Sequence, residues 1–247
     1  MRIAIISDVH SNLAALEAVL RHAQGQGATG ETWCLGDMVG YGPQPQQCLA
    51  RLRDAGARAL VGNHDLAAIG ELSIRDFNQD AATAALWTGK QLTNEERGYI
   101  GGLPQVIEER EFTLVHGTLR WPVWEYLYSY EAAAAHLERQ RSPFGLVGHT
   151  HVPMLVVEGP QFPQGCEMYY LEDGATVELS PGRRLVINPG GVGQPRDGDL
   201  RASYAVYDTE ASTITIHRVE YDIAATQKLM AAAGLPRWLI ERLAMGR

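Results

Sequence analysis

The fold is decided by the opening segment Arg2-Ile3-Ala4-Ile5-Ile6-Ser7-Asp8-Val9-His10, in which an apolar run leads directly into an aspartate and a histidine. The apolar run predicts a short buried strand over residues 2–7. Residues 12–23 carry Leu13, Leu16, Val19 and Leu20 at helical spacing and predict a helix. The segment therefore predicts a strand, a polar loop and a helix in succession.

The same unit recurs further along the chain. Residues 32–35 predict a second strand, residues 36–45 form a loop rich in glycine and proline, and residues 46–55 predict a second helix. A third strand is predicted over residues 57–61 and runs into Gly62-Asn63-His64-Asp65. Strands that alternate with helices favour a parallel sheet with reactive loops at the carboxyl ends of its strands.

The rest of the chain divides into a helical segment, a strand-rich segment and a helical tail. Residues 66–104 are alanine-rich and predict a helical cap over the sheet, with Thr93-Asn94-Glu95-Glu96 as a capped helix start. Strands are predicted over residues 112–115, 144–147, 154–157, 166–171, 176–179, 184–187, 203–208 and 213–219, and a helix over residues 130–139. The tail covers about residues 222–247. Because no linker or repeat divides the chain, we predict one domain over residues 1–247.

The composition is that of a globular protein, with 45% hydrophobic and 20% charged residues. The N-terminal apolar run is too short for a signal peptide or a membrane span, so we expect no membrane partner. Three widely spaced cysteines, Cys34, Cys48 and Cys166, indicate neither a disulfide framework nor a zinc ribbon, which favours a cytoplasmic setting. The net charge of -8 argues against nucleic acid as a partner, and a homo-oligomer is left open.

Chemistry-bearing side chains gather in short clusters that follow the predicted strands. Five of the eight histidines lie in or beside these clusters, which contain Asp8, His10, Asp37, Asn63, His64, His116, His149 and His151. On an extended backbone, Asp8 and His10 point to the same side and can share one ion. Asp37 can bridge two ions because a carboxylate has two oxygens. The other histidines, His22, His136 and His217, are interpreted as surface or packing residues.

The types of side chain indicate divalent metals. Carboxylate, amide and imidazole ligands without a thiolate suit Mn, Fe, Zn, Ni, Co or Mg, with Mn favoured. Two such ions ~3.5–4 Å apart clamp a phosphoryl group and lower the pKa of a shared water. The sequence therefore predicts a site with two divalent metal ions.

The order and spacing of five motifs resemble the calcineurin-like metallophosphoesterase superfamily. The motifs are Asp8-Val9-His10, Gly36-Asp37, Gly62-Asn63-His64-Asp65, His116-Gly117 and Gly148-His149-Thr150-His151. The resemblance covers roughly the first three-fifths of the chain. It implies a mixed α/β fold, a four-layer αββα sandwich of two mixed β-sheets flanked by helices, with a dinuclear site at the edge of the sheets.

The resemblance also implies a role for each motif residue. One metal would be held by Asp8, His10, Asp37 and His151, and the other by Asp37, Asn63, His116 and His149. His64 matches the catalytic histidine that contacts the substrate phosphate and protonates the leaving oxygen, with Asp65 orienting its ring.

Three further residues are candidates for substrate binding. The loops at residues 36–43 and 188–196 look like those of small bacterial and archaeal phosphodiesterases of this superfamily. Arg196 is then a candidate phosphate contact, with a surface salt bridge to Asp197 or Asp199 as the alternative. Asn12 and Tyr41 lie beside predicted ligands and are candidates for lining the pocket.

These observations predict a metal-dependent phosphoesterase that hydrolyses phosphodiester or phosphomonoester bonds of small molecules by attack of a hydroxide bridging two metal ions. A diadenosine-polyphosphate hydrolase is an alternative, because Gly40-Tyr41-Gly42-Pro43 also occurs in that branch. A protein phosphatase and a non-catalytic metal-binding scaffold are further alternatives, and the presence of His64 argues against the scaffold. Specificity is expected from residues 66–104 and 117–130, where Arg120 and Trp121 either read a base or an aryl group or only pack.

Overall fold

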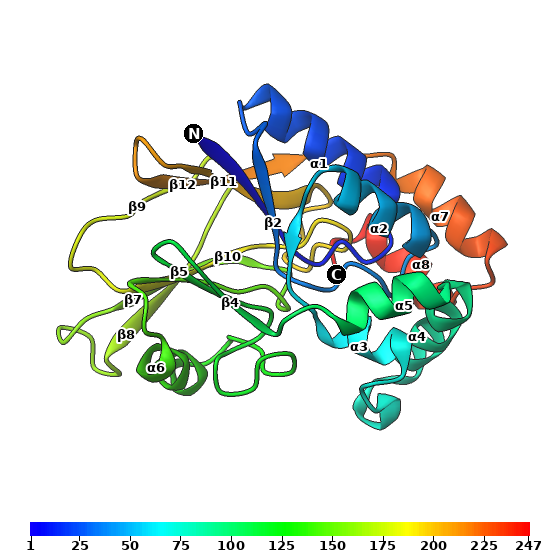
Figure 1. Cartoon of the computed structure of the whole chain (residues 1–247), viewed down its shortest axis with the longest axis horizontal. Helices are drawn as coiled ribbons and strands as arrows, with labels where there is room; N and C mark the ends of the chain where they lie inside the picture. Colours follow the sequence, from blue (N-terminus) through cyan, green and yellow to red (C-terminus); the bar gives the residue numbers. More distant parts are fainter.

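Two six-stranded sheets form the centre of the computed structural model, which describes residues 1–247 (Figure 1). The first sheet has the order β3 (Arg58–Ala59), β2 (Glu31–Cys34), β1 (Arg2–Ile6), β11 (Ala202–Asp208), β12 (Thr213–Val219) and β9 (Thr176–Glu178). The second has the order β4 (Val106–Glu109), β5 (Phe112–Val115), β6 (Phe144–Leu146), β10 (Leu185–Pro189), β7 (Pro153–Glu158) and β8 (Cys166–Tyr170). Both sheets mix parallel and antiparallel pairs.

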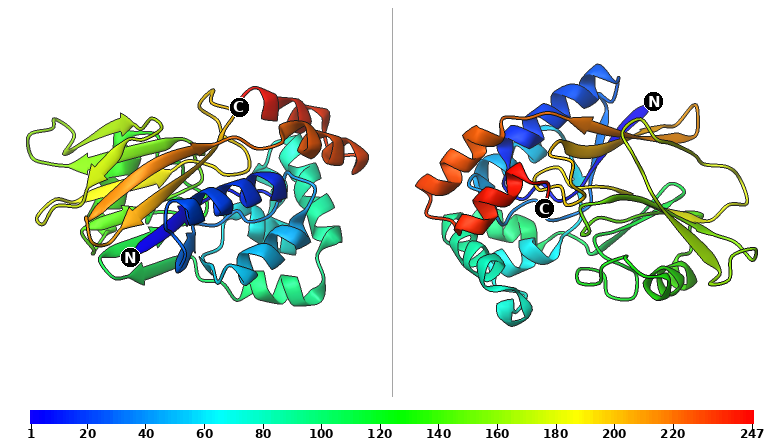
Figure 2. Two further views of the ribbon diagram at one scale, coloured as in Figure 1. Left: turned by 90° about the horizontal axis from the view of Figure 1, so that it is seen from above. Right: turned by 180° about the vertical axis from the view of Figure 1, so that it is seen from behind.

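Helices cover the outer faces of both sheets. They are α1 (Leu13–Gly25), α2 (Pro45–Asp54), α3 (Asn63–Ile69), α4 (Gln79–Gln91), α5 (Asn94–Gly101), α6 (Tyr130–Arg139), α7 (Ile223–Ala232) and α8 (Arg237–Glu241), with short 3-10 turns η1 (Ile74–Asp76) and η2 (Arg242–Ala244). Helices α1 and α2 lie on the first sheet and α6 lies on the second (Figure 2). The predicted four-layer αββα sandwich is confirmed.

The alternation of side chains along β1 explains how the layers pack. Ile3 and Ile5 point between the two sheets, whereas Ala4 and Ile6 point toward the helices, and all four are buried. A strand that is apolar on both faces belongs in the middle of a layered fold, because successive side chains face opposite ways. The opening segment therefore contributes to two cores at once and carries Asp8 to the end of the central strand.

The cap segment and the C-terminal tail pack against each other beside the loop that carries Tyr41. A cluster of seven buried apolar residues joins α4, α7, α8 and η2, and it contains Tyr41, Ala81, Ala84, Met230, Leu235, Leu239 and Leu243. The capping box predicted at Thr93 and Glu96 begins α5. None of the helices has the length and apolar composition that a membrane crossing requires.

Three elements differ from the prediction. Strand β4 was not predicted, because it is an edge strand in which only Ile107 is buried and it lacks a clear apolar pattern. The third strand is shorter than predicted, since the Val61 amide bonds to the Pro104 carbonyl instead of to β2. Helix α3 begins at Asn63, before residue 66, because the Asp65 carboxylate accepts from the Gly62 amide in the first turn.

Candidate metal centre

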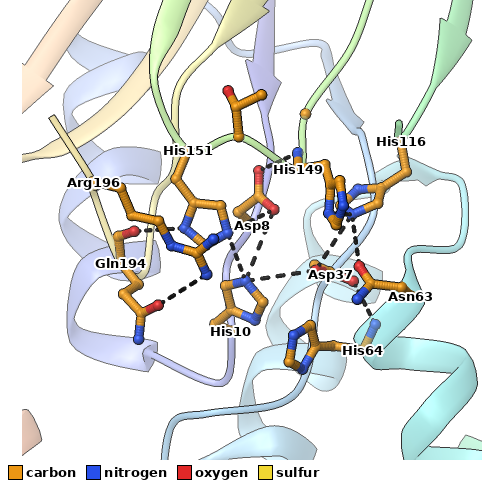
Figure 3. A network of polar contacts seen from close by, with 12 residues as sticks. Asp8, His10, Asp37, Asn63, His64, His116, His149, His151, Gln194 and Arg196 are labelled. Carbon is orange, nitrogen blue, oxygen red and sulfur yellow. Dashed lines mark hydrogen bonds and ion pairs between the residues drawn. The ribbon is translucent and has the colours of Figure 1, made fainter. Parts of the chain in front are cut away.

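The predicted ligands come together at the carboxyl ends of the central strands (Figure 3). They form two buried clusters, one of Asp8, His10 and His151 and the other of Asp37, His116 and His149. Within each cluster the candidate ligand atoms lie within 4.8 Å of one another. Asn63 joins the second cluster, with its Oδ1 atom 3.2 Å from Nε2 of His116. Each cluster offers the geometry of a metal site.

Each of the two aspartates has one oxygen bonded to the backbone and one oxygen free. Oδ2 of Asp8 accepts from the His149 amide at 3.0 Å, and Oδ1 of Asp37 accepts from the His64 amide at 2.9 Å. The other oxygens, Oδ1 of Asp8 and Oδ2 of Asp37, are buried and accept no hydrogen bond. A buried anionic oxygen without a partner is strongly unfavourable, so both oxygens fit a cation.

Asp37 lies between the two clusters. Its Oδ2 atom is 3.3 Å from Nε2 of His116 and 3.6 Å from Nε2 of His10, which belong to different clusters. In the first cluster, Oδ1 of Asp8 is 3.2 Å from Nε2 of His151. Asp37 is therefore the residue able to contact ions in both clusters.

Backbone carbonyls orient the four imidazoles. Nδ1 of His10 lies 3.2 Å from the Val39 carbonyl oxygen, and Nδ1 of His116 lies 2.7 Å from that of Leu35. Nδ1 of His151 lies 2.5 Å from the Gln194 carbonyl oxygen. His149 uses its other nitrogen, Nε2, which lies 3.3 Å from the Trp124 carbonyl oxygen. A carbonyl only accepts, so the bonded ring nitrogen carries a proton, and the other nitrogen of a neutral ring presents a lone pair to the cluster. Metal-binding histidines adopt the same arrangement, in which the ring nitrogen that does not bind the metal donates its N–H to a carbonyl oxygen.

The protonation states suit cation binding with one exception. Burial lowers the pKa of His10, His149 and His151, so these rings are neutral. Although burial alone raises the pKa of Asp8, the neighbouring His151 and His116 imidazoles hold it well below its usual range. For His116, burial is outweighed by the adjacent Asp37 carboxylate, which raises the pKa to about 9. A metal ion would displace the proton of His116.

The loops of the site have an unusual backbone. The φ angles of Asp8 (55°), His10 (47°), Asp37 (52°), His149 (66°) and His151 (59°) are all positive, a region that residues other than glycine rarely adopt. The prediction that Asp8 and His10 share a side of an extended strand is therefore wrong, because a left-handed turn brings them together. Such strain concentrates at functional sites, where the surrounding structure maintains it.

Two glycines make room for the clusters. A Cβ atom on Gly62 would lie 2.1 Å from Oδ1 of Asp37, and one on Gly191 would lie 2.9 Å from Cβ of His151. Any larger residue at either position would displace a candidate ligand.

His64 lies beside the clusters, but Asp65 does not touch its ring. His64 is buried, its ring centroid is 5.0 Å from that of His10, and its Nδ1 atom has no hydrogen-bond partner. Both oxygens of Asp65 accept from backbone amides, Oδ1 from Val39 and Oδ2 from Gly62, each at 3.0 Å. The prediction that Asp65 orients the imidazole is wrong, because its carboxylate instead ties the loop after β2 to the start of α3.

Arg196 extends over the first cluster. Its Nη2 atom donates to Gln194 at 3.2 Å, its guanidinium carbon lies 5.8 Å from the centre of the Tyr41 ring, and it forms no ion pair (Figure 3). The alternative partners are engaged elsewhere, Asp197 with Arg218 and Asp199 with Arg201. The surface salt bridge is therefore excluded, and Arg196 stays available to an anion.

Asn12 and Tyr41 have different environments. Asn12 is 1% exposed, its Oδ1 caps α1 through the Ala15 amide, and its Nδ2 donates to the Gly193 carbonyl. The substrate contact predicted for Asn12 is wrong, because the side chain is buried and its amide holds two loops together. Tyr41 does line the hollow in front of the clusters, as predicted.

Sequence reasoning missed four residues that surround the site. Phe77, Trp124 and Tyr126 line the hollow, and Arg242 of the tail is close enough to Arg196 that burial and repulsion from Arg196 lower its pKa to about 10. None of them belongs to a motif. Arg120 and Trp121 do not line the hollow, since Arg120 pairs with Glu125 and Glu131 and stacks on Trp121. The packing alternative for these two residues is correct.

A two-sheet sandwich that brings paired clusters of imidazoles and carboxylates to the ends of its strands has the architecture and the candidate ligands of a metal-dependent hydrolase. The calcineurin-like phosphoesterase superfamily domain matches residues 1–212, and the chain belongs to this superfamily. The protein is a hydrolase that acts on phosphoester bonds.

The chain is similar to several known proteins along its whole length. It shares 46% identity with a metallophosphoesterase from Sphaerobacter thermophilus, whose crystal structure superposes with a TM-score of 0.90 over 100% of both chains. An uncharacterized protein of Methanocaldococcus jannaschii is 38% identical over 250 residues, covering 99% of this chain and 98% of that protein. A hypothetical protein from Pyrococcus horikoshii OT3 has the same fold, with a TM-score of 0.79 at 17% identity over 100% of this chain and 98% of that one.

A more distant relative carries an assigned activity. The symmetrical bis(5'-nucleosyl)-tetraphosphatase of Vibrio cholerae is 29% identical over 154 residues, which are 56% of this chain and 52% of that protein. The similarity thus spans about half of each protein.

Proposed function

We propose that this protein hydrolyses phosphodiester or phosphomonoester bonds of small molecules with two divalent metal ions, and that residues 1–247 act as one domain. The observation that carries the proposal is the convergence of two buried carboxylate oxygens that accept no hydrogen bond with the Nε2 atoms of His10 and His151, which face each other with no proton between them. Only a cation satisfies all of these acceptors at once.

The two clusters suggest how the ligands divide. Asp8, His10, Asp37 and His151 hold one ion, and Asp37, Asn63, His116 and His149 hold the other. A ligand set that lacks a thiolate and mixes carboxylate, amide and imidazole suits Mn, Fe, Zn, Co or Ni, and among these we favour manganese. Bound together, the two ions would clamp the phosphoryl group and supply a hydroxide at neutral pH.

Two residues outside the ligand set act on the substrate in this proposal. Arg196 binds phosphate oxygens, because it has no carboxylate partner and faces the first cluster. Burial lowers the pKa of His64 to about 4, so its ring is neutral in the free protein. The negative charge of an entering phosphate raises that pKa, and the imidazolium can then protonate the leaving oxygen.

The size of the hollow supports a small substrate. The hollow has a volume of about 440 Å³ and is bordered by the cap segment and the loop after β5. This volume suits a small molecule and argues against the protein phosphatase alternative. A diadenosine-polyphosphate hydrolase remains a second candidate, supported by the partial similarity to the Vibrio cholerae enzyme. The three cysteines are free and buried, in keeping with the cytoplasmic setting that we propose.

The proposal is tested by stripping the protein of metal and reloading it with Mn²⁺, Ni²⁺, Zn²⁺ or Mg²⁺. Hydrolysis of bis-(p-nitrophenyl) phosphate is then compared with that of p-nitrophenyl phosphate. Metal-dependent cleavage of the diester would support a phosphodiesterase, and a preference for the monoester would support a phosphatase. An absence of turnover with every metal would contradict the proposal and favour the scaffold alternative.

A further inference from the structure

The hollow beside the second cluster has a polar floor and aromatic walls. Asn63, His64 and His149 form the floor, so a phosphate held at the clusters would lie next to it. Phe77 and Trp124 form one wall, and they come from the two segments expected to determine specificity. A substrate group attached to that phosphate would therefore extend along these aromatic side chains.

The aromatic rings stack on one another and form a continuous aromatic surface. Phe77 and Trp124 lie nearly parallel, with ring centroids 5.3 Å apart and 22° between their planes. The Tyr126 ring lies on the His149 imidazole at 3.9 Å and 12°. Trp124 is 36% exposed, so with one face of its ring on Phe77 it still presents surface to solvent directly beside the site. Exposed aromatic surface of this kind marks a binding site for a planar group.

Hydrogen-bonding groups border the same wall. Asp76 and Asn78 flank Phe77 and also line the hollow. Oδ1 of Asn78 accepts from the Ala81 amide at 2.9 Å, which leaves its NH₂ group free as a donor, and Asp76 forms no ion pair. A free donor and a free acceptor beside an aromatic face match the edge of a nucleobase, whereas a plain aryl ring offers nothing for them to bind.

We propose that this hollow binds the nucleobase of a nucleoside phosphoester, with Trp124, which Phe77 backs, against the face of the base and Asp76 and Asn78 at its edge. This inference rests on the proposed function, because it takes the phosphate to lie at the metal clusters. It narrows the substrate class of that site and assigns the residues that select it.

The loop after β5 provides a matched control. Trp121 lies three residues before Trp124, is 59% exposed and packs on Arg120 outside the hollow. The carbonyl of Trp124 holds His149 through the backbone, so a side-chain substitution keeps that contact. Comparing Trp124→Ala with Trp121→Ala thus separates loss of the stacking ring from loss of any exposed tryptophan in this loop.

The test uses pairs of esters that differ only in the base. Adenosine 5′-phosphate is compared with ribose 5-phosphate, and the methyl ester of each phosphate forms the corresponding diester pair. We expect the metal-loaded protein to favour the adenosine compounds in kcat/KM by about tenfold or more, the size of one base–aromatic stack. Trp124→Ala should abolish most of this preference, Trp124→Phe should keep it, and Trp121→Ala should leave it unchanged. Equal kcat/KM for the two members of a pair, or a preference that survives Trp124→Ala, would overturn the inference.

A binding measurement separates this inference from the proposed function. Saturation-transfer NMR with adenosine alone, which has no phosphate to hydrolyse, reports occupancy of the hollow without turnover. A signal in the wild-type protein that is lost in Trp124→Ala and kept in Trp121→Ala would support the nucleobase site even if no ester is cleaved. The absence of a signal in the wild-type protein would overturn it even if other phosphoesters are hydrolysed.

Discussion

The Nε2 atoms of His10 and His151 lie 3.1 Å apart in the interior of the protein, and each ring has its Nδ1 atom on a backbone carbonyl. Two lone pairs therefore face each other, a contact that repels unless a cation lies between them. In the second cluster, Nε2 of His116 and Nδ1 of His149 lie at the same distance of 3.1 Å, and without a metal the extra proton of His116 lies at this contact. The site is thus built for ions, and its properties without them follow from this geometry.

Metal removal should lower the stability of the protein. A ligand that binds only the folded state adds about 4 kcal/mol to the free energy of unfolding when its concentration is a thousand times Kd. We expect the chelator-treated protein to have a clearly lower Tm than the Mn²⁺-loaded protein in thermal unfolding. Equal Tm values in a sample shown by elemental analysis to bind metal would contradict this expectation.

Replacing His64 by Ala should reduce turnover and leave the metal content unchanged. His64 is not a ligand in our assignment, and loss of a general acid costs roughly 10² to 10⁴ in rate. His217→Ala is the control, because it also replaces a histidine, one that is half-buried on β12, and it should leave turnover unchanged. Normal turnover of His64→Ala would remove this residue from the mechanism, and loss of metal would make it a structural part of the site.

Replacing Arg196 by Ala should weaken phosphate binding. A charge-assisted hydrogen bond contributes about 1.5–3 kcal/mol, so kcat/KM should fall by roughly 10- to 100-fold. Arg201→Ala serves as a control, because this arginine pairs with Asp173 and Asp199 away from the clusters. If both variants have the kcat/KM of the wild-type protein, Arg196 does not contact the substrate.

Replacing Asp65 by Asn should destabilise the protein. Both oxygens of Asp65 accept from backbone amides, and an NH₂ group in place of one of them would face an N–H donor. Loss of a buried hydrogen bond with an unsatisfied donor costs about 1–3 kcal/mol in the free energy of unfolding. Urea denaturation measures the change, and an unchanged midpoint would show that Asp65 does not hold the loop.

His136 should make the stability depend on pH in the acid range. Its Nδ1 atom accepts from the Leu119 amide, its Nε2 atom bonds to Gln140, and burial lowers its pKa to about 4. The unfolded chain binds a proton below about pH 6.5 and the folded chain does not, so stability rises with pH between about 4 and 6.5. His136→Gln should reduce this slope, by at most about 1.4 kcal/mol per pH unit, in urea denaturation at several pH values. An identical slope in both proteins would mean that His136 titrates normally.

Much of the fold and the grouping of the site could be predicted because each motif directly follows a strand. Asp8, Asp37 and Asn63 lie at the ends of parallel neighbours, which a strand–helix alternation brings to one edge of a sheet. The packing of His136 in the interior also agrees with its interpretation. These features depend on local sequence and on a general rule of chain topology.

The remaining features depend on contacts between distant segments. Phe77 and Trp124 meet only because the cap segment and the loop after β5 fold toward each other. The sequence predicts that Asp65 orients the ring of its neighbour His64. In the structure the Asp65 carboxylate instead accepts from the Val39 amide, which is remote in sequence. The left-handed turn at Asp8 and His10 is likewise imposed by the surrounding loops, since a positive φ is uncommon for residues other than glycine.

The most direct test of the account is a titration of metal-free protein with Mn²⁺, in which bound metal per chain and hydrolysis of bis-(p-nitrophenyl) phosphate are measured together. The account predicts two ions per chain in the wild-type protein, with activity that reaches its plateau at two equivalents, and at most one tightly bound ion in Asp37→Ala. Activity that needs no metal, or a stoichiometry of two that persists in Asp37→Ala, would contradict a site bridged by Asp37.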